Sequence, residues 1–182
     1  MRHRVLLLAG LMVLAAASLS AQTSGPPETV RSVDLKRYQG RWYEIAKYPN
    51  RFEKVCARNV TAEYAIRPDG RISVTNTCVK ASGKVKVAEG EAKIDDKQTN
   101  AKLRVRFAPN FLSWLPWVWG QYWILELDAE YRHVLVGDSS RDYFWILSRD
   151  PVMSEPLYSE LLKRAEAKGF DPKRVVRTEQ GR

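Results

Sequence analysis

The sequence predicts an all-β protein: an eight-stranded antiparallel up-and-down barrel with one C-terminal α-helix packed against its outside. Two observations predict this class. Short segments of alternating apolar and polar residues follow one another, separated by turn residues, as in a closed antiparallel meander. A lone helical pattern follows the last of them. The roughly 160 residues behind an N-terminal leader are enough for one domain with a substantial core.

The leader has the composition of a secretory signal peptide, which we place at residues 1–21. An uncharged apolar run of 15 residues, Val5 to Leu19, follows basic residues and ends in small ones. This run is shorter than the ~20 residues that a helix needs to span a bilayer. No cysteine lies near the cleavage point, so we expect no lipid anchor. Residues 22–33 are predicted to be a linker, and residues 34–182 the folded domain.

The first strands are expected at residues 41–48, 59–66 and 71–78. The last two flank the turn sequence RPDG and form a hairpin. In residues 83–94 the small and apolar residues change from odd to even positions near a glycine. This phase change predicts a β-bulge or a sharp bend.

The remaining strands are expected further along the chain. Residues 102–107 alternate cleanly, and three more strands follow at 120–128, 132–138 and 141–149. A helix is then predicted from the N-cap Ser154 to the terminator Gly169. Residues 173–178 are compatible with one more short strand. The helix carries one apolar stripe made of Leu157, Tyr158, Leu161, Leu162 and Ala165.

Two features of composition bear on the class of protein. Cys56 and Cys78 stand at the open end of the predicted hairpin, so a secreted chain is expected to join them in a disulfide worth roughly 3 kcal/mol. Without Arg2 and Arg4, 28 Lys and Arg residues face 21 Asp and Glu residues, a net charge of +7. These charges are spread along the chain, which fits a solvated basic face or weak attraction to acidic lipid. Secretion argues against a nucleic-acid partner.

Three motifs in order carry a resemblance to a known family. They are GRWYEIAKYP (40–49), LDAEYRHVLVGD (127–138) and WILSR (145–149). With this spacing the chain resembles the lipocalin family from about Leu35 to about Arg177, and within it the bacterial outer-membrane (Blc) and apolipoprotein D types. The resemblance implies binding, storage or transport of a small hydrophobic or amphipathic ligand. The leader predicts secretion across the inner membrane into the periplasm, and peripheral contact with the outer membrane stays open.

The first and last motifs predict how one end of the barrel is closed. By strand parity, Arg149 is expected to lie over the indole of Trp42, a cation–π contact worth about 1–2 kcal/mol when desolvated. Gly40 would let the chain cross closely beneath. In the resemblance too, these three residues are structural and do not touch ligand.

Ligand contacts are predicted from the resemblance and from parity. The resemblance implies Tyr64, Asn76 and Trp145, and alternation adds wall residues. Small residues on the presumed inner face favour a cavity over a filled barrel, which is the alternative for a small barrel. Glu44 and Glu126 interrupt apolar strands, and each is equally compatible with an inward or an outward position. The residues added by parity or by position are Ala62, Val74, Leu103, Phe107 and Tyr122.

Apolar residues also crowd the connection between the fifth and sixth strands. Three interpretations compete: a satellite core, a homodimer surface, and shallow insertion into an anionic membrane, for which Trp is well suited. We favour contact with a partner or membrane, aided by Arg104 and Arg106 nearby. The connection contains Phe111, Leu112, Trp114, Leu115 and Trp117.

The sequence gives little support for catalysis. The mature chain has one histidine, His133, which argues against a multi-histidine metal site. A hydrolase acting on lipid through Ser139 and His133 is the alternative, but Ser139 fits a turn better. We therefore expect a binding protein that is not an enzyme and holds no cofactor or metal. Its ligand would be a fatty acid, a lysophospholipid or a similar lipid.

Overall fold

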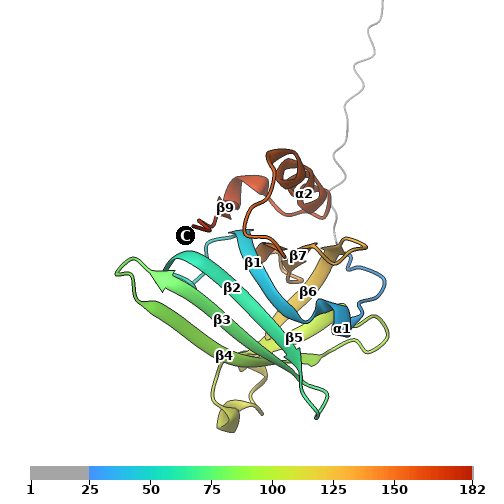
Figure 1. The fold of residues 1–182 in the computed structure, drawn as a ribbon. Coiled ribbons are helices and arrows are strands. Elements are labelled where there is room, and N and C mark those ends of the chain that lie inside the picture. Colours follow the sequence, from blue (N-terminus) through green and yellow to red (C-terminus); the bar gives the residue numbers. More distant parts are fainter. Residues whose placement is uncertain (1–24, 182) are drawn as a thin grey trace, which may run out of the picture.

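The computed structural model describes residues 25–181 and confirms the predicted class, a closed barrel of eight antiparallel strands with a helix outside (Figure 1). Strands follow one another around the barrel in chain order, and β1 pairs with both β2 and β8, which closes it. The predicted signal peptide lies outside the described residues. The strands are β1 (Gly40–Lys47), β2 (Cys56–Ile66), β3 (Ile72–Lys80), β4 (Val85–Ile94), β5 (Lys102–Arg106), β6 (Gly120–Leu127), β7 (His133–Gly137) and β8 (Phe144–Ser148).

Short helices flank these strands. α1 (Leu35–Tyr38) precedes β1, and its first N–H groups are capped by Asp34. The predicted helix is α2 (Glu155–Ala167), which ends before Gly169 at φ +85°. The expected short strand is β9 (Val176–Arg177), paired with β1. The 3-10 helices are η1 (Asn110–Leu112), η2 (Pro116–Val118) and η3 (Pro172–Arg174).

Alternation along the strands sorts apolar residues into two cores. On β7, Val134 and Val136 point into the barrel, whereas Leu135 points outward. The inner core gathers near α1. The outer core lies between the barrel wall and α2, where Tyr158, Leu161 and Ala165 are buried as the helical stripe predicted.

The β-bulge predicted in β4 is absent. β3 and β4 pair without a register shift from Ile72↔Ala92 to Val79↔Val85. Val85 and Val87 are exposed on the outer face, so the change of parity in the sequence reflects apolar residues outside the barrel and no bulge in the backbone. Register shifts occur instead in β1, β2 and β6.

The two ends of the barrel differ. α1 and the connections 67–71, 95–101 and 128–132 lie at the end that Trp42 and Arg149 close. Because the strands are antiparallel, the connections 48–55, 81–84, 107–119 and 138–143 lie together at the opposite end, which we call the mouth. The Trp-rich connection projects below the barrel in Figure 1. Strand order thus places it at the mouth, which periodicity alone left open.

Both ends of the described segment pack on the barrel. In the segment predicted as a linker, the backbone N–H of Val30 donates to Ile124 (3.0 Å) and Val33 is buried. β1 and β2 pair only over residues 40–43 and 61–64. Beyond that point the C-terminal segment fills the gap, where the Gln180 side chain donates to the carbonyls of Glu44 and Val60, both at 2.8 Å. The tail therefore completes the wall.

Candidate ligand-binding cavity

The barrel encloses a cavity of about 760 Å³, so the filled-barrel alternative is not supported. This volume falls in the range of pockets that hold small molecules. Ala88 and Ala92 line it, as their small size suggested. Each residue predicted for the ligand site lies on its wall, namely Tyr64, Asn76, Trp145, Tyr122, Ala62, Val74, Leu103 and Phe107.

The packing of Phe107 against β4 requires a glycine at position 90. A Cβ atom there would lie 2.4 Å from the carbonyl oxygen of Arg106 and 2.7 Å from the Phe107 ring. Phe107 therefore packs against a bare stretch of β4 backbone, which only glycine provides. Gly90 thus allows the Phe107 ring to lie beside the mouth without a clash with β4.

The guanidinium of Arg149 closes the opposite end. It lies 3.8 Å from the centroid of Trp42, the contact that parity predicted. Trp42 is fully buried, and its Nε1 donates to the Tyr38 carbonyl at 2.9 Å. Gly40, at φ +89°, brings the backbone close to the guanidinium, since a Cβ would lie 3.5 Å from Nη1. The guanidinium donates to five backbone carbonyls, those of Arg37, Tyr38, Gln39, Arg41 and Tyr131.

Three tyrosine hydroxyls form a chain at the deep end of the cavity. The Tyr122 hydroxyl lies 2.7 Å from that of Tyr38 and 2.9 Å from that of Tyr64. Burial raises the pKa of Tyr64 to about 12 and raises those of Tyr38 and Tyr122 well above the ordinary value. All three therefore stay protonated at neutral pH. Three protons serve two hydrogen bonds, so one O–H remains to donate elsewhere.

Asn76 adds an acceptor on the same wall. Its Oδ1 is buried and has no hydrogen-bond partner among the described residues. A buried polar atom without a partner is costly, and such an atom facing a cavity suits a polar ligand group or a water. The deep half of the cavity thus combines apolar walls with a few neutral polar atoms.

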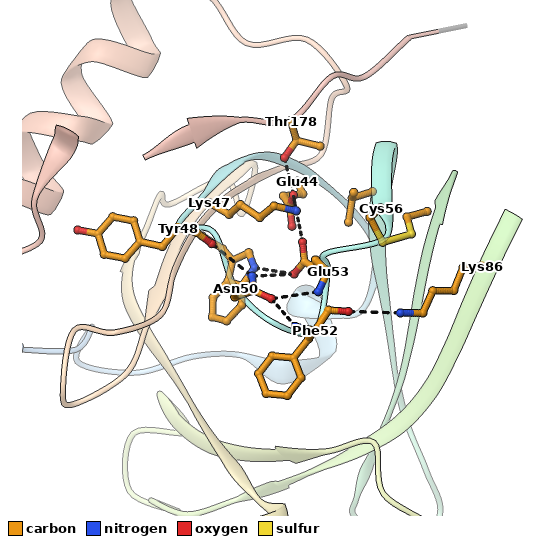
Figure 2. A network of polar contacts seen from close by, with 12 residues as sticks. Glu44, Lys47, Tyr48, Asn50, Phe52, Glu53, Cys56, Lys86 and Thr178 are labelled. Carbon is orange, nitrogen blue, oxygen red and sulfur yellow. Dashed lines mark hydrogen bonds and ion pairs between the residues drawn. A yellow bond between two sulfur atoms is a disulfide. The ribbon is translucent and has the colours of Figure 1, made fainter. Parts of the chain in front are cut away.

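A polar network holds the first mouth connection, residues 48–55, against the barrel. Figure 2 shows Lys47 between Glu44 and Glu53, with Thr178 of the tail donating to Glu44. Asn50 accepts from the backbone N–H groups of Phe52 (3.0 Å) and Glu53 (3.2 Å) and so folds the connection back on itself. The Trp145 indole N–H donates to Glu53 at 3.1 Å.

The two carboxyl groups of this network titrate differently. Burial, reinforced by the neighbouring Glu53 carboxylate, raises the pKa of Glu44 to about 8. Burial also acts on Glu53, but the hydrogen bond from Glu44 and the Lys47 ammonium outweigh it and hold the pKa of Glu53 below its ordinary value. At neutral pH, Glu44 is therefore neutral and Glu53 pairs with Lys47. Of the two alternatives left open for Glu44 and Glu126, Glu44 lines the cavity, whereas Glu126 points outward to Lys168 of the α2 C-cap at 2.9 Å.

The Trp-rich connection divides into a buried and an exposed part. Trp119, at its C-terminal end, is buried, whereas Phe111, Trp114 and Trp117 are 74, 76 and 75% exposed. Leu112 and Leu115 are half-buried. The satellite-core interpretation is therefore not supported for Phe111, Trp114 and Trp117.

The two arginines expected to aid membrane contact beside this connection differ in exposure. Arg106 is 2% exposed and ion-paired to Glu91, and its guanidinium donates to the carbonyls of Ala108 (2.5 Å) and Pro109 (2.7 Å). Arg104 pairs with Asp95 at 3.1 Å. Arg106 is therefore structural and is not available to attract lipid, whereas Arg104 remains partly exposed.

The predicted disulfide is present, and the hydrolase pair is not formed. Cys56 and Cys78 are joined, with their Cα atoms 5.6 Å apart. Ser139 lies at the mouth, where its hydroxyl donates to Gln121 at 2.6 Å. His133 is the first residue of β7, at the opposite end of the barrel. From the rise per residue of a β-strand, it lies roughly 15 Å from Ser139. The described residues contain no cluster of His, Cys, Asp and Glu that could hold a metal ion.

Sequence reasoning missed two residues of the site. Tyr38 lies on the short helix α1 and reaches the tyrosine chain from outside the strand pattern. Glu53 lies in a mouth connection, where an acidic residue predicts solvent exposure. The only signal for Glu53 was indirect: if Glu44 points inward, its buried carboxyl group requires a polar partner.

A closed antiparallel barrel with an apolar cavity and a mouth at one end defines a binding protein for small hydrophobic molecules. The profile of the Lipocalin-like domain matches residues 33–180. This chain belongs to the lipocalin family, whose members are generally binding and transport proteins.

Similar proteins agree with this assignment. The chain is 43% identical over 155 residues to temperature-induced lipocalin-1 of Arabidopsis thaliana, covering 84% of this chain and 82% of that protein. It is 36% identical over 181 residues to the outer membrane lipoprotein Blc of Escherichia coli, covering 97 and 98%. Apolipoprotein D of Mus musculus is 32% identical over 161 residues, covering 85 and 80%. Insecticyanin from the tobacco hornworm Manduca sexta shares the fold at 20% identity, with a TM-score of 0.65, covering 86% of this chain and 84% of that one.

Proposed function

We propose that this protein binds a single-chain amphiphile, a fatty acid or a lysophospholipid, and stores or carries it in the cell envelope. The observation that carries the proposal is the cavity of about 760 Å³, lined largely by apolar side chains. Burying about ten methylenes offers ~8 kcal/mol. Ordering the acyl chain and losing its free motion offset several kcal/mol of this, which leaves micromolar or somewhat tighter affinity.

The distribution of charge around the cavity supports one orientation of the ligand. The cations on its wall, Arg51 and Lys86, both belong to the mouth end, as do two acidic residues, Asp138 and Glu53, the latter paired with Lys47. The deep end offers neutral tyrosine hydroxyls and the Asn76 amide. An anionic or zwitterionic head group would therefore stay near the mouth, and the acyl chain would point toward Trp42.

Native mass spectrometry of the purified protein, followed by lipid extraction, tests the carrier function directly. We expect a retained lipid, and quenching of Trp fluorescence when the delipidated protein is titrated with a long-chain amphiphile. A protein that carries no lipid and whose fluorescence responds to no long-chain amphiphile would contradict the proposal.

Filling the cavity should abolish binding. Ala88→Phe places a ring inside the cavity opposite Asn76, and we expect the Kd for a long-chain fatty acid to rise by roughly tenfold or more, since the acyl chain loses its space. Val87→Phe is the matched control, because Val87 precedes Ala88 on β4 but lies on the exposed outer face. Fluorescence titration measures both, and equal affinities would place the ligand elsewhere.

The cellular location is part of the same proposal. Residues 1–21 have the composition of a signal peptide, and one relative is named as an outer membrane lipoprotein. Among residues 25–181, no helix is long and apolar enough to cross a bilayer. We propose a periplasmic protein, and osmotic-shock fractionation of cells expressing the full chain tests it.

A further inference from the structure

Exposed apolar side chains are concentrated at the mouth of the barrel. Of the eleven large hydrophobic residues exposed in the described chain, eight belong to the mouth connections or to the strand end beside them. Phe52 and Val55 lie in the first connection, and Val85 and Val87 begin β4. The other four lie in the connection 107–119, which we call the aromatic loop: Phe107, Phe111, Trp114 and Trp117.

The aromatic loop holds a defined shape. Arg106 binds its first residues through the carbonyls of Ala108 and Pro109 and through Asn110 Oδ1 at 2.8 Å. At its far end, Trp119 is buried, and its indole N–H donates to the Ser113 carbonyl at 2.8 Å. Phe111 and Trp114 are thus presented to solvent by a loop anchored at both ends, and their exposure is built into the fold.

Five cations at the mouth differ from many at the closed end in making no ion pair with a carboxylate of the described residues. We call these Arg51, Lys54, Lys80, Lys84 and Lys86 the rim cations. Of these, Lys86 donates to the Phe52 carbonyl at 3.3 Å and Arg51 lies over the Phe52 ring. Toward the closed end, Arg41, Arg67 and Arg132 pair with Glu63, Asp69 and Asp150.

The acidic residues of the mouth do not offset the rim cations. Glu53 is held by Lys47 and Asp138 is buried, which leaves Asp142 as the exposed carboxylate of the mouth connections. The mouth therefore presents positive charge around apolar side chains.

We propose that the mouth docks on the surface of a bilayer that contains anionic phospholipid. Tryptophan is favoured at the membrane–water interface, where its ring meets the acyl boundary and its N–H stays hydrated. Lysine and arginine beside it gain roughly 1 kcal/mol each from an anionic leaflet. The mouth supplies both on one surface.

A second copy of the chain fits this surface less well. A two-fold symmetric contact between mouths would bring the rim cations of both copies together. Like charges across an interface are costly, and Asp142, the one exposed carboxylate of the mouth connections, is outnumbered by the five rim cations. An anionic bilayer instead satisfies the apolar residues and the cations together.

Docking would join the bilayer to the cavity. Trp117 and Phe52 line the cavity and are also 75 and 55% exposed, so apolar surface runs from the rim to the interior. An acyl chain could then pass between bilayer and barrel with little exposure to water. This transfer step rests on the proposed carrier function, whereas docking itself does not.

Flotation of the mature protein with vesicles of phosphatidylcholine and phosphatidylglycerol (1:1), or of phosphatidylcholine alone, tests the docking. We expect the wild type to bind the anionic vesicles. The double variant Phe111→Ser/Trp114→Ser should bind them at least roughly tenfold more weakly. Neither residue lines the cavity. Val152→Ser, at a residue 77% exposed beside α2, is the control and should bind like the wild type. Equal binding of the loop variant and the wild type would overturn the proposal.

A second pair of variants tests the electrostatic part without touching the loop. Lys54→Gln/Lys84→Gln should bind anionic vesicles on the order of tenfold more weakly and show a shallower salt dependence. Lys36→Gln/Lys97→Gln removes the same charge from the closed end and should change neither. Equal losses in both pairs would overturn docking through the mouth.

Two further readouts separate the outcomes. If sedimentation velocity shows a dimer that the loop variant dissociates, and no variant binds vesicles, the surface joins two copies and the proposal is wrong. Fatty-acid titration in vesicle-free solution should give the loop variant the affinity of the wild type. If neither protein bound fatty acid, the carrier function would fail while vesicle binding still reported on docking.

Discussion

Replacing Arg149 with methionine should lower the free energy of unfolding by about 3–5 kcal/mol. The guanidinium donates to five backbone carbonyls around α1 and covers the Trp42 ring at 3.8 Å. Methionine keeps the stem but leaves those carbonyls without their donor. Arg149→Lys should recover less than half of the loss, because one ammonium cannot reproduce the planar fork. Urea denaturation with the disulfide intact measures all three proteins.

Arg132→Met is the matched control. Arg132 lies in the neighbouring connection and pairs with Asp150, but both side chains are about half exposed, at 52 and 53%. An exposed ion pair contributes little, so we expect a loss below about 1 kcal/mol. Similar losses at positions 149 and 132 would show that the arginine over Trp42 does not hold the closed end.

The second large effect is a pH dependence of stability that Glu44 imposes. Its pKa is about 8 in the folded protein against an ordinary value of 4.5, so between these values the folded state holds a proton that the unfolded state has released. Stability is therefore greatest below pH 4.5 for this group and falls as pH rises, by about 1.4 kcal/mol per unit, until it levels off above pH 8. The lowered pKa of Glu53 acts below this window, and the raised pKa of Lys47 acts above it.

Glu44→Gln should remove this slope, because the amide is neutral at every pH. At pH 9 we expect the free energy of unfolding of the variant to exceed that of the wild type by about 3 kcal/mol or more. At pH 5 the two values should differ by about 1 kcal/mol or less. Glu63→Gln, which removes an exposed carboxylate paired with Arg41, should leave the slope intact. Chemical denaturation at several pH values measures this. Parallel profiles for wild type and Glu44→Gln would mean that Glu44 is ionised in the folded protein.

Local patterns predicted most of the fold because each strand buries one face. Val134 and Val136 alternate with Leu135, and the stripe Leu157 to Ala165 faces the barrel as its spacing requires. The pattern failed at Val85 and Val87, where apolar side chains are exposed beside the mouth. Alternation assumes that the apolar face is the buried one, and a surface with another use violates that assumption.

The wall of the cavity was predicted better than its polar groups. Tyr64, Asn76 and Trp145 lie on it, as motif and parity placed them. Tyr38 and Glu53 could not be foreseen, since each reaches the site from a segment without strand periodicity. Their positions follow from how α1 and the connection 48–55 fold across the two ends.

The sequence by itself determined the class of fold, the disulfide, and the arginine–tryptophan contact at the closed end, because periodicity and motif spacing record which residues share a face. Tertiary structure alone decided that the interior is hollow, that Glu44 is neutral beside an ionised Glu53, and that the aromatic loop stands at the mouth. Those properties depend on volumes, burial and distances between residues far apart in the chain. A linear pattern carries no measure of such quantities.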